Sequence, residues 1–363
     1  RCAFLVMKLL LDAPINDLSF GNVSLNLIRE FYKREIDLGL FPTRGRVNLS
    51  AFTIEDGLKK YIEDSINNRY NYLGEDIPSL KLWHLDGAEE RKNPRQYLYT
   101  FYECSDPTTV EVNIAKCQTK TIFSSTYSRD SFRQKGCTDA ESVPLGFDED
   151  FKIIEGKALE GVIHFGLMGK FEQRKHTGRI IQAWLKKYGN NNKYQLTCCV
   201  TNPFFKPEGM QRVLEQTLGG KRYTNVNFLP RLEKNSEVNE LLNAIDIDLT
   251  GLSGGEGWNL PAFNATCLGK WSVVLNETSH KDWATDNNSI LVESSGKFDC
   301  YDDAFFKKGI SFNQGHFYNW EEEQVIAAME KAESKAGQIN TEGRKLAEKM
   351  TYSNTVDGIF SHI

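Results

Sequence analysis

Residues 246–276, DIDLTGLSGGEGWNLPAFNATCLGKWSVVLN, decide the fold. The apolar run at 246–252 predicts a strand, and the run at 271–276 predicts a second strand. Between them, Pro261 and Gly269 bracket an apolar helical pattern. Proline is typical of the first turn of a helix and glycine of its end. A strand, a loop, a helix and a strand in this order predict a parallel sheet with a crossover helix.

The loop of this stretch, SGGEGWN, holds one carboxylate, Glu256, among three glycines just before the helix begins. The N-terminus of a helix already attracts anions, so a glutamate placed there needs a partner or a ligand. Glycines allow the backbone to approach a ligand closely. Taken alone, the loop is compatible with any anion-binding nest.

The same alternation of short apolar runs with longer amphipathic runs continues along the chain. Strands are expected at 8–13, 96–103, 120–126, 161–169, 194–200 and 226–230, and helices at 24–35, 128–136, 176–189, 208–220, 235–245 and through much of 321–350. Asn235 or Ser236 is expected to cap the helix at 235–245. The pattern predicts an α/β protein with two doubly wound domains, joined by a hinge near residues 148–160.

Composition supports a globular protein of two domains. The chain has 363 residues, of which 26% are charged and 40% hydrophobic, and its formal net charge is −5. This acidic balance gives no reason to expect a nucleic-acid partner. No apolar run reaches the length of a membrane span. We expect the first core strand to start at Met7 and residues 1–6 to be an upstream extension rather than a signal peptide.

Cysteine and histidine usage argues against disulfides and metal sites. The eight cysteines, which are Cys2, Cys104, Cys117, Cys137, Cys198, Cys199, Cys267 and Cys300, form no C-x-x-C pair. They predict free thiols in a reducing compartment, and therefore a cytoplasmic protein. The six histidines lack metal-ligand spacing, so no metal is expected. Walker A, G-x-G-x-x-G and H-E-x-x-H motifs are all missing from the sequence.

A second segment that could bind a ligand is GLMGKFEQRKHTGRIIQAW at 166–184. A predicted strand ends there, and Lys170, Arg174 and Lys175 precede a predicted helix. Three cations beside a helix N-terminus suit a diphosphate, although a solvated basic loop explains the spacing equally well. Because this loop and the Glu256 loop both follow strands of one domain, they can line one crevice.

Together the two loops resemble the nucleotide-sugar site of retaining glycosyltransferases of family 4, also called glycosyl transferases group 1. The family's G-R/K loop is matched by Gly169 and Lys170, with Lys175 five residues further on. Its S-x-x-EG-x-x-LP motif is matched by Ser253, Glu256, Gly257, Leu260 and Pro261. Residues 226–257 are similar to the segment that wraps the nucleotide base, and residues 143–151 to the entry of the hinge. The resemblance covers about residues 100–350.

The resemblance implies a GT-B fold, in which two Rossmann-like domains face a central cleft. Residues 1–155 would form the acceptor-side domain, with a last helix near 345–363 returning to it, and residues 156–344 the donor domain. The implied activity is that of a hexosyltransferase. It would move a sugar from a UDP-, GDP- or ADP-sugar to a hydroxyl of a glycan or another acceptor, with retention and without a metal or other cofactor.

The resemblance also assigns site residues. Lys170 and Lys175 would stabilise the departing diphosphate, with Arg174 a weaker candidate, and Glu256 would bind the sugar hydroxyls. The N-terminal loop LSFGNVS, with Gly21 and Asn22, would approach the diphosphate from the other domain. The full donor-binding set is Gly21, Asn22, Gly169, Arg174, Asn202, Ser253, Gly255, Gly257, Trp258, Asn259, Leu260 and Asn264.

One position departs from the family pattern. The family places a second glutamate eight residues after the first, where it usually binds the ribose hydroxyls, and here that position is Asn264. An asparagine carbonyl still accepts a hydrogen bond but carries no charge. This departure supports one alternative, a GT-B relic that binds a nucleotide or sugar without turnover. A glycosyltransferase of modified DNA bases is a further alternative that the acidic net charge disfavours.

Overall fold

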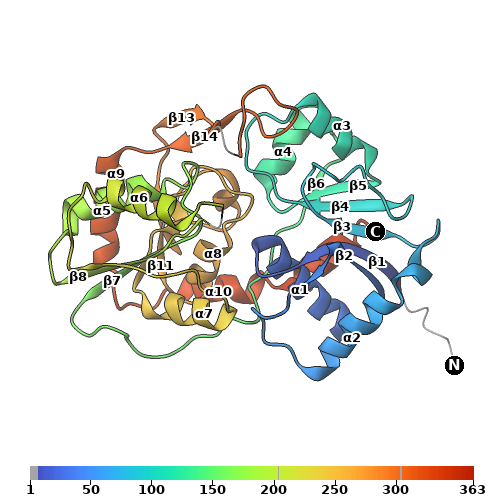
Figure 1. Cartoon of the computed structure of the whole chain (residues 1–363), viewed down its shortest axis with the longest axis horizontal. Coiled ribbons are helices and arrows are strands. Elements are labelled where there is room, and N and C mark those ends of the chain that lie inside the picture. The colour runs from blue at the N-terminus through green and yellow to red at the C-terminus, as the bar shows by residue number, and fades with distance from the viewer. Residues whose placement is uncertain (1–6, 203, 303–304) are drawn as a thin grey trace. The chain divides into compact units, whose positions relative to one another are not determined.

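A computed structural model describes residues 7–202, 204–302 and 305–363, so the expectations for residues 1–6, Cys2 included, lie outside the described part. The chain forms two compact units (Figure 1). Unit 1 consists of the chain up to Asp150 together with Lys308–Gln314 and Met350–Ile363. Unit 2 consists of Phe151–Lys307 and Gly315–Lys349.

Unit 1 is built on a parallel sheet in the order β2-β1-β3-β4-β5-β6. Its strands are β1 (Lys8–Ile15), β2 (Asp37–Val47), β3 (Ser79–Leu82), β4 (Gln96–Thr100), β5 (Lys120–Phe123) and β6 (Glu141–Ser142). Its helices are α1 (Ser19–Lys33), α2 (Asp56–Asn67), the short 3₁₀ helix η1 (Arg69–Tyr72), α3 (Thr109–Cys117), α4 (Thr126–Gln134) and α11 (Tyr352–Phe360). The apolar run of β1 is buried on both faces, as a central parallel strand requires.

Unit 2 is built on a second parallel sheet, in the order β12-β11-β10-β7-β8-β9. Its strands are β7 (Ile163–Met168), β8 (Tyr194–Cys199), β9 (Val226–Phe228), β10 (Ile247–Asp248), β11 (Trp271–Leu275) and β12 (Ser289–Val292), and an antiparallel hairpin adds β13 (Gly296–Asp299) and β14 (His316–Asn319). Its helices are α5 (Thr177–Tyr188), α6 (Pro207–Thr217), α7 (Asn235–Ala244), α8 (Leu260–Cys267), α9 (Glu322–Glu333), α10 (Thr341–Lys349) and the 3₁₀ helices η2 (Thr250–Leu252) and η3 (Thr278–Asp282).

Helices cover both faces of the unit 2 sheet. In Figure 1, α5, α6 and α9 lie on one side of it and α7, α8 and α10 on the other. The apolar stripe of α5 explains its place, because Ile180, Ile181 and Trp184 are fully buried. In the last turn of α5, Lys186 and Lys187 form ion pairs with glutamates of α9. The core of this unit therefore lies between α5, α9 and the sheet.

The order of the second sheet reverses between β7 and β10. β7 pairs with β8 on one side and with β10 on the other, although β10 follows much later in the chain. In doubly wound sheets, ligands bind beyond the carboxyl ends of the strands at such a reversal. Both loops singled out in the sequence leave the sheet there. The basic loop (residues 169–176) follows β7, and the glutamate loop (residues 249–259) follows β10. The fold of unit 2 thus brings the two loops to one place.

Three local expectations were wrong. The expected strand at 246–252 is only Ile247–Asp248 followed by η2, because Gly251 turns against β11, where a Cβ would lie 2.6 Å from the Val273 carbonyl oxygen. Neither Asn235 nor Ser236 caps α7, since Lys234 is the N-cap residue. The segment 18–24 is not a glycine loop, because α1 already begins at Ser19.

The C-terminal helical segment is broken in two. α9 ends at Glu333 and α10 begins at Thr341, and Gly337 lies between them in a left-handed conformation with φ +75°. α11 follows in unit 1, where Phe360 stacks on Phe31 of α1 with ring centroids 5.6 Å apart. The single last helix expected near 345–363 is therefore the end of α10 and the whole of α11.

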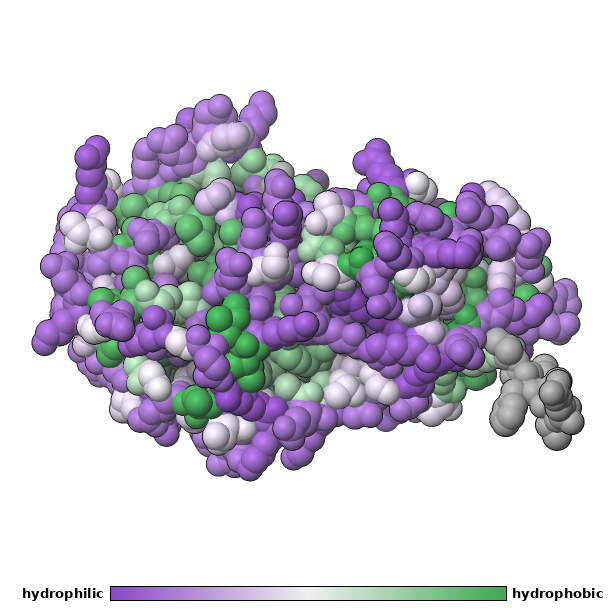
Figure 2. Space-filling view, turned by 90° about the horizontal axis from the view of Figure 1, so that it is seen from below, coloured by the Kyte–Doolittle hydropathy of each residue, from purple (hydrophilic) through white to green (hydrophobic). Residues whose placement is uncertain are grey.

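Most of the described thiols are buried, and the surface is mainly hydrophilic on the face that Figure 2 shows. None of the seven described cysteines forms a disulfide, and all except Cys117 are buried. No helix in the described ranges is long and apolar enough to cross a membrane. The face shown in Figure 2 is mainly hydrophilic, and hydrophobic side chains form separate small patches on it.

Candidate active site

The two loops at the reversal point are joined by a backbone hydrogen bond at Gly254, which also bonds to β14. The Gly254 amide donates to the Arg174 carbonyl over 2.8 Å, and the Gly254 carbonyl accepts from the Tyr318 amide of β14 over 2.7 Å. A Cβ at position 254 would lie 2.4 Å from the Tyr318 carbonyl oxygen and 2.7 Å from His176 Nε2. Only glycine fits between these three segments, which explains one glycine of the SGGEG run.

Glu256 lies between two cations of the neighbouring loop. Lys175 Nζ is 2.5 Å from Glu256 Oε1, and Arg174 Nη1 is 3.1 Å from Glu256 Oε2. Arg174 also donates to the Gly255 carbonyl oxygen over 2.5 Å and pairs with Glu172 over 3.2 Å. The Glu256 side chain is only 8% exposed. The carboxylate that looked out of place beside a helix N-terminus is therefore compensated by two fixed positive charges.

The ionisation of Glu256 follows from this arrangement. Burial alone would raise the pKa of its carboxyl, but Lys175 and Arg174 outweigh burial and hold the pKa well below its usual range. Glu256 is therefore a fixed anion with acceptor capacity only. Charge-assisted hydrogen bonds of such a carboxylate are stronger than those between neutral groups.

The three predicted cations are not equivalent. Lys170 lies apart from the Glu256 pair, with its side chain 41% exposed, 3.9 Å from Glu172 and over the ring of Phe204 at 5.2 Å. Arg174, ranked below Lys170 from the sequence, contacts Glu256 directly. The structure thus places Lys175 and Arg174 at the glutamate and Lys170 at the edge of the same loop.

Glycine and asparagine residues shape the basic loop. Gly169 has φ +119°, which only glycine adopts readily, and a Cβ there would lie 3.4 Å from the side chain of Lys175. Asn202, at the carboxyl end of β8, is 97% buried, donates to the Phe171 carbonyl oxygen and accepts from the Phe204 amide. Asn202 therefore acts on the loop conformation from the neighbouring strand.

Helix α8 begins directly after the glutamate loop. Asn259 is its N-cap residue in a left-handed conformation with φ +70°, and Leu260 starts the helix. Trp258 is buried and packs its ring against Phe263. Asn264, one turn into the helix, is 4% exposed, and its Oδ1 accepts no hydrogen bond within the described ranges. A buried amide oxygen of this kind calls for a partner.

The remaining predicted residues divide between the units. Ser253 and Gly257 are buried members of the glutamate loop, and the Ser253 hydroxyl is 3.5 Å from the Arg174 carbonyl oxygen. Gly21 and Asn22 belong to unit 1, in the first turns of α1. A Cβ at position 21 would lie 1.9 Å from the Asn16 carbonyl oxygen, so this glycine permits a close backbone approach. Their assignment to the donor stays a prediction.

The sequence did not predict the buried residues that contact the two loops and hold them in place. His176 is buried, and its Nε2 lies 2.9 Å from the Tyr318 carbonyl oxygen. Thr278 and His280, in η3 after β11, contact Glu256 and Asn259 respectively. These contacts join segments that are distant in sequence. The run TSHKD after a predicted strand was the one local signal available.

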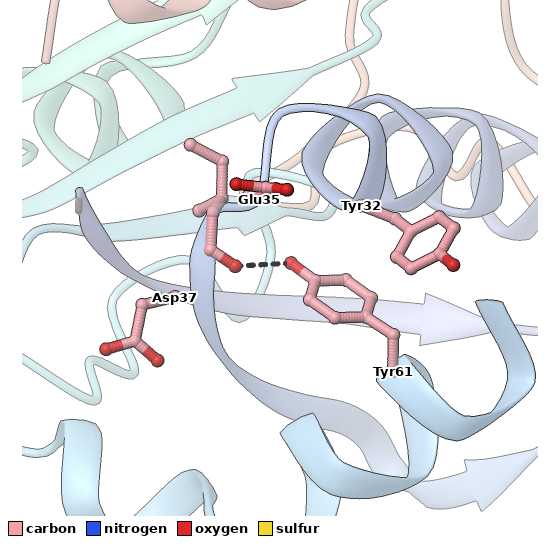
Figure 3. Close-up of a pocket in the computed structure, with 5 residues that line it drawn as sticks. Tyr32, Glu35, Asp37 and Tyr61 are labelled. Atoms are coloured by element: carbon pink, nitrogen blue, oxygen red, sulfur yellow. Dashed lines mark hydrogen bonds between the residues drawn. The ribbon is translucent and has the colours of Figure 1, made fainter. Parts of the chain in front are cut away.

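A hollow of about 450 Å³ lies in unit 1, lined by Tyr32, Glu35, Ile36, Asp37 and Tyr61 (Figure 3). The Tyr61 hydroxyl donates to the Ile36 carbonyl oxygen over 2.8 Å. Asp37 is the first residue of β2, so the hollow lies at the amino end of that strand. Doubly wound sheets bind ligands at the opposite, carboxyl ends. The hollow therefore does not coincide with the candidate site.

Asp248, at the end of β10 beneath the site, makes the stability of the protein depend on pH. It is fully buried, accepts from the Thr250 amide over 3.1 Å, and burial raises its pKa from 3.8 to about 6. The folded state binds the Asp248 proton more tightly than the unfolded chain does. This proton therefore adds on the order of 3 kcal/mol to the free energy of unfolding below pH 4, and the contribution is lost as pH rises through about 6.

Asp248→Asn should remove this dependence. We expect the melting temperature of the variant minus that of the wild type to be more positive at pH 8 than at pH 4. Asp148, whose pKa burial also raises to about 6, is the same in both proteins and cancels in the difference. Equal differences at the two pH values would show that Asp248 ionises normally.

Metal ligation is not evident in the described ranges, because no group of three or more His, Cys, Asp or Glu side chains there is arranged to hold an ion.

Comparisons with known proteins agree with this fold. No family model matches the sequence, and no curated protein sequence matches it. Among solved structures, sucrose-phosphate synthase from Thermosynechococcus elongatus superposes with a TM-score of 0.67 at 11% identity over 97% of each chain. The α,α-trehalose 6-phosphate synthase of Burkholderia multivorans gives 0.65 at 12% identity, over 98% of this chain and 95% of that one.

A third solved structure is Anabaena HepE in complex with UDP and glucose. It superposes with a TM-score of 0.62 at 13% identity, over 98% of this chain and 100% of that one. At identities of 11–13%, these superpositions establish a shared fold, which is the GT-B fold. The chain therefore has the GT-B fold, with a parallel six-stranded sheet in each of its two units.

Proposed function

We propose that the protein is a glycosyltransferase that moves a sugar from a nucleotide-diphosphate sugar to a hydroxyl acceptor. One observation carries the proposal: Glu256 is fixed by Lys175 and Arg174 at the strand-order reversal of unit 2. The GT-B fold supports it, because solved structures with this fold include sugar-phosphate synthases and a complex with UDP and glucose.

The cations of the basic loop suit a departing diphosphate. The two loops contain Lys170, Arg174 and Lys175 against the carboxylates of Glu172 and Glu256, which leaves a net charge of +1. Negative charge grows on the diphosphate as the glycosidic bond breaks, and positioned cations stabilise it most in that state. The N-terminal amides of α8, which follow directly, favour the same charge.

Glu256 is suited to the sugar. It is ionised and accepts hydrogen bonds only, so it binds hydroxyl groups that donate. Holding the sugar in a reactive pose lowers the barrier by removing rotational freedom before reaction. Asn264 would meet the ribose with a neutral acceptor in place of a second carboxylate.

Finer features of the proposal rest on the resemblance to family 4. These are retention of configuration, independence of metal ions, a donor site in residues 156–344 and acceptor binding by residues 1–155. A glycan is the expected acceptor class. A cytoplasmic location is proposed because the described thiols are mainly buried and form no disulfide.

A thermal-shift series with UDP-, GDP- and ADP-glucose tests the proposal. A ligand at 100 times its Kd stabilises the folded state by about 2.7 kcal/mol, so we expect one nucleotide series to raise the melting temperature by several degrees. The matching nucleoside monophosphate serves as the control, since it lacks the diphosphate and should give a smaller shift. If none of the three nucleotide sugars shifts the melting temperature at millimolar concentration, unit 2 is not a donor domain.

A GT-B relic that binds without turnover is the second candidate. Two observations favour it: Asn264 replaces a carboxylate, and both Lys175 and Arg174 are bonded to Glu256 in this structure. Measuring sugar transfer and donor hydrolysis with the nucleotide sugar that binds would separate the two functions. Binding without either reaction, across a panel of hydroxyl acceptors, would favour the relic.

A further inference from the structure

The segment Glu277–Asp282 after β11 packs behind the glutamate loop, and it contains a strained residue. Thr278 has φ +53° and is 1% exposed. A β-branched residue in the left-handed region is a conformational outlier, and the surrounding structure must hold it there. Glycine or asparagine would adopt the same backbone at lower cost. The threonine side chain therefore needs a reason of its own.

The reason lies in the contact of Thr278 with Glu256. The Glu256 backbone amide donates to Thr278 Oγ1 over 3.3 Å, and both residues are buried. The hydroxyl thus fixes the backbone of the residue that carries the carboxylate. Two cations hold the other end of the same residue, so Glu256 is fixed at its amide and at its side chain.

His280 fixes the loop at a second point through a chain of hydrogen bonds. Asn259 Nδ2 is 3.0 Å from the Thr250 carbonyl oxygen and 2.9 Å from His280 Nε2, and His280 Nδ1 is 2.8 Å from the Leu275 carbonyl oxygen. Because carbonyl oxygens only accept, Nδ2 donates to both of its partners and Nδ1 carries the histidine proton. The chain of bonds is complete only with a neutral histidine.

The surroundings keep His280 neutral. It is fully buried, and burial lowers its pKa to about 4, although Glu256 nearby acts to raise it and Lys175 to lower it. The amide of Asn259 is then held by two bonds through Nδ2, while its Oδ1 accepts no bond within the described ranges. His280 therefore sets the direction of a buried acceptor at the N-terminus of α8.

We propose that Thr278 and His280 are positioning residues that hold Glu256 and Asn259 in the geometry needed for sugar transfer. This inference rests on the proposed function of the same site. The physical basis is the sensitivity of catalysis to geometry, since a displacement of about 1 Å in a positioning group can cost a factor of about 100. A third loop, after β11, thereby joins the loops after β7 and β10 in one site.

Isosteric and conservative variants of Thr278 test the inference. Thr278→Val keeps the shape and removes the acceptor, whereas Thr278→Ser keeps the acceptor. With whichever of UDP-, GDP- or ADP-glucose the wild type turns over, we expect Thr278→Val to lower kcat at least about tenfold. The donor KM should stay within about threefold, and Thr278→Ser should keep kcat within about threefold of the wild type. His280→Gln, which retains an acceptor and a donor, should keep more activity than His280→Leu.

Thr266→Val is the matched control, because Thr266 is also a buried threonine of unit 2. Its hydroxyl donates to the Ala262 carbonyl oxygen over 2.9 Å and lies 2.9 Å from the Ser272 hydroxyl, and neither residue belongs to the glutamate loop. It should lower the melting temperature without lowering kcat. Equal losses of kcat in Thr266→Val and Thr278→Val would overturn the inference.

The failure of the inference differs from the failure of the function. If Thr278→Val keeps wild-type kcat while Glu256→Ala loses activity, Thr278 does not position the glutamate but the site assignment stands. If Glu256→Ala also keeps wild-type kcat, the proposed site itself is wrong. Melting temperatures of all variants, measured in the same buffer, identify any that fail to fold.

Discussion

Glu256→Ala is expected to lower kcat/KM for sugar transfer by at least about tenfold, or roughly 1.4 kcal/mol of transition-state stabilisation. Lys175→Ala should cause a loss of at least the same size. The carboxylate would no longer hold the sugar hydroxyls, and the missing ammonium would no longer stabilise the departing diphosphate. Steady-state kinetics with the nucleotide sugar that gives the thermal shift measures both effects.

The two losses should not add. Lys175 Nζ and Glu256 Oε1 are 2.5 Å apart and largely buried, so each single substitution leaves the other charge without this partner. We therefore expect the double variant to lose less than the product of the single losses. Glu256→Gln, which keeps the volume of the side chain, separates the loss of charge from the loss of packing.

An exposed ion pair of the same unit provides the control. Lys187 of α5 pairs with Glu330 of α9 at the surface, and such pairs contribute little to stability. Lys187→Ala and Glu330→Ala should leave kcat/KM unchanged within about twofold. Wild-type kinetics in both Lys175→Ala and Glu256→Ala would contradict the site assignment.

The parts of this site that were predictable follow local rules. Alternating apolar runs predicted β7, α5, β11 and the approximate start of α8. This was possible because hydrophobic periodicity and the proline and glycine signals at the ends of elements act within a few residues. Glu256 and Lys175 were identified because glycines and charges cluster at predicted strand ends, where a doubly wound sheet binds ligands. Both loops lie in unit 2 and contact each other, as expected for one crevice.

The parts that were not predictable depend on contacts between distant segments. The ranking of Lys170 over Arg174 came from a motif, whereas the contact of Arg174 with Glu256 depends on how the two loops meet across the sheet. Thr278 approaches Glu256 only because β11 lies beside β10. Likewise, the hairpin of β13 and β14 has only four residues in each strand, and it carries Tyr318 to Gly254. No periodicity encodes such pairings.

Gly254→Ala is expected to cause the other large loss, in stability and in activity together. A Cβ at this position would lie 2.4 Å from the Tyr318 carbonyl oxygen, 2.7 Å from His176 Nε2 and 3.2 Å from the Arg174 carbonyl oxygen. Two of these atoms belong to the backbone, so the loop must shift rather than a side chain. Overpacking of this kind costs about 1–3 kcal/mol. Because Glu256 is two residues away, a shift of about 1 Å should lower kcat by about 100-fold.

Gly209→Ala is the matched control for this substitution, because it also adds one methyl group to a glycine of unit 2. Gly209 lies within α6, and apart from its neighbours and the backbone of its own helix, a Cβ there would have no atom of the described residues within 4 Å. Alanine in a helix is more favourable than glycine by about 0.5–1 kcal/mol, so this variant should melt at a higher temperature with unchanged kcat. If Gly254→Ala instead melts with the wild type and keeps its kcat, the hydrogen bonds of Gly254 to Arg174 and Tyr318 do not determine where Glu256 lies. The glutamate would then be held by its two cations and by Thr278.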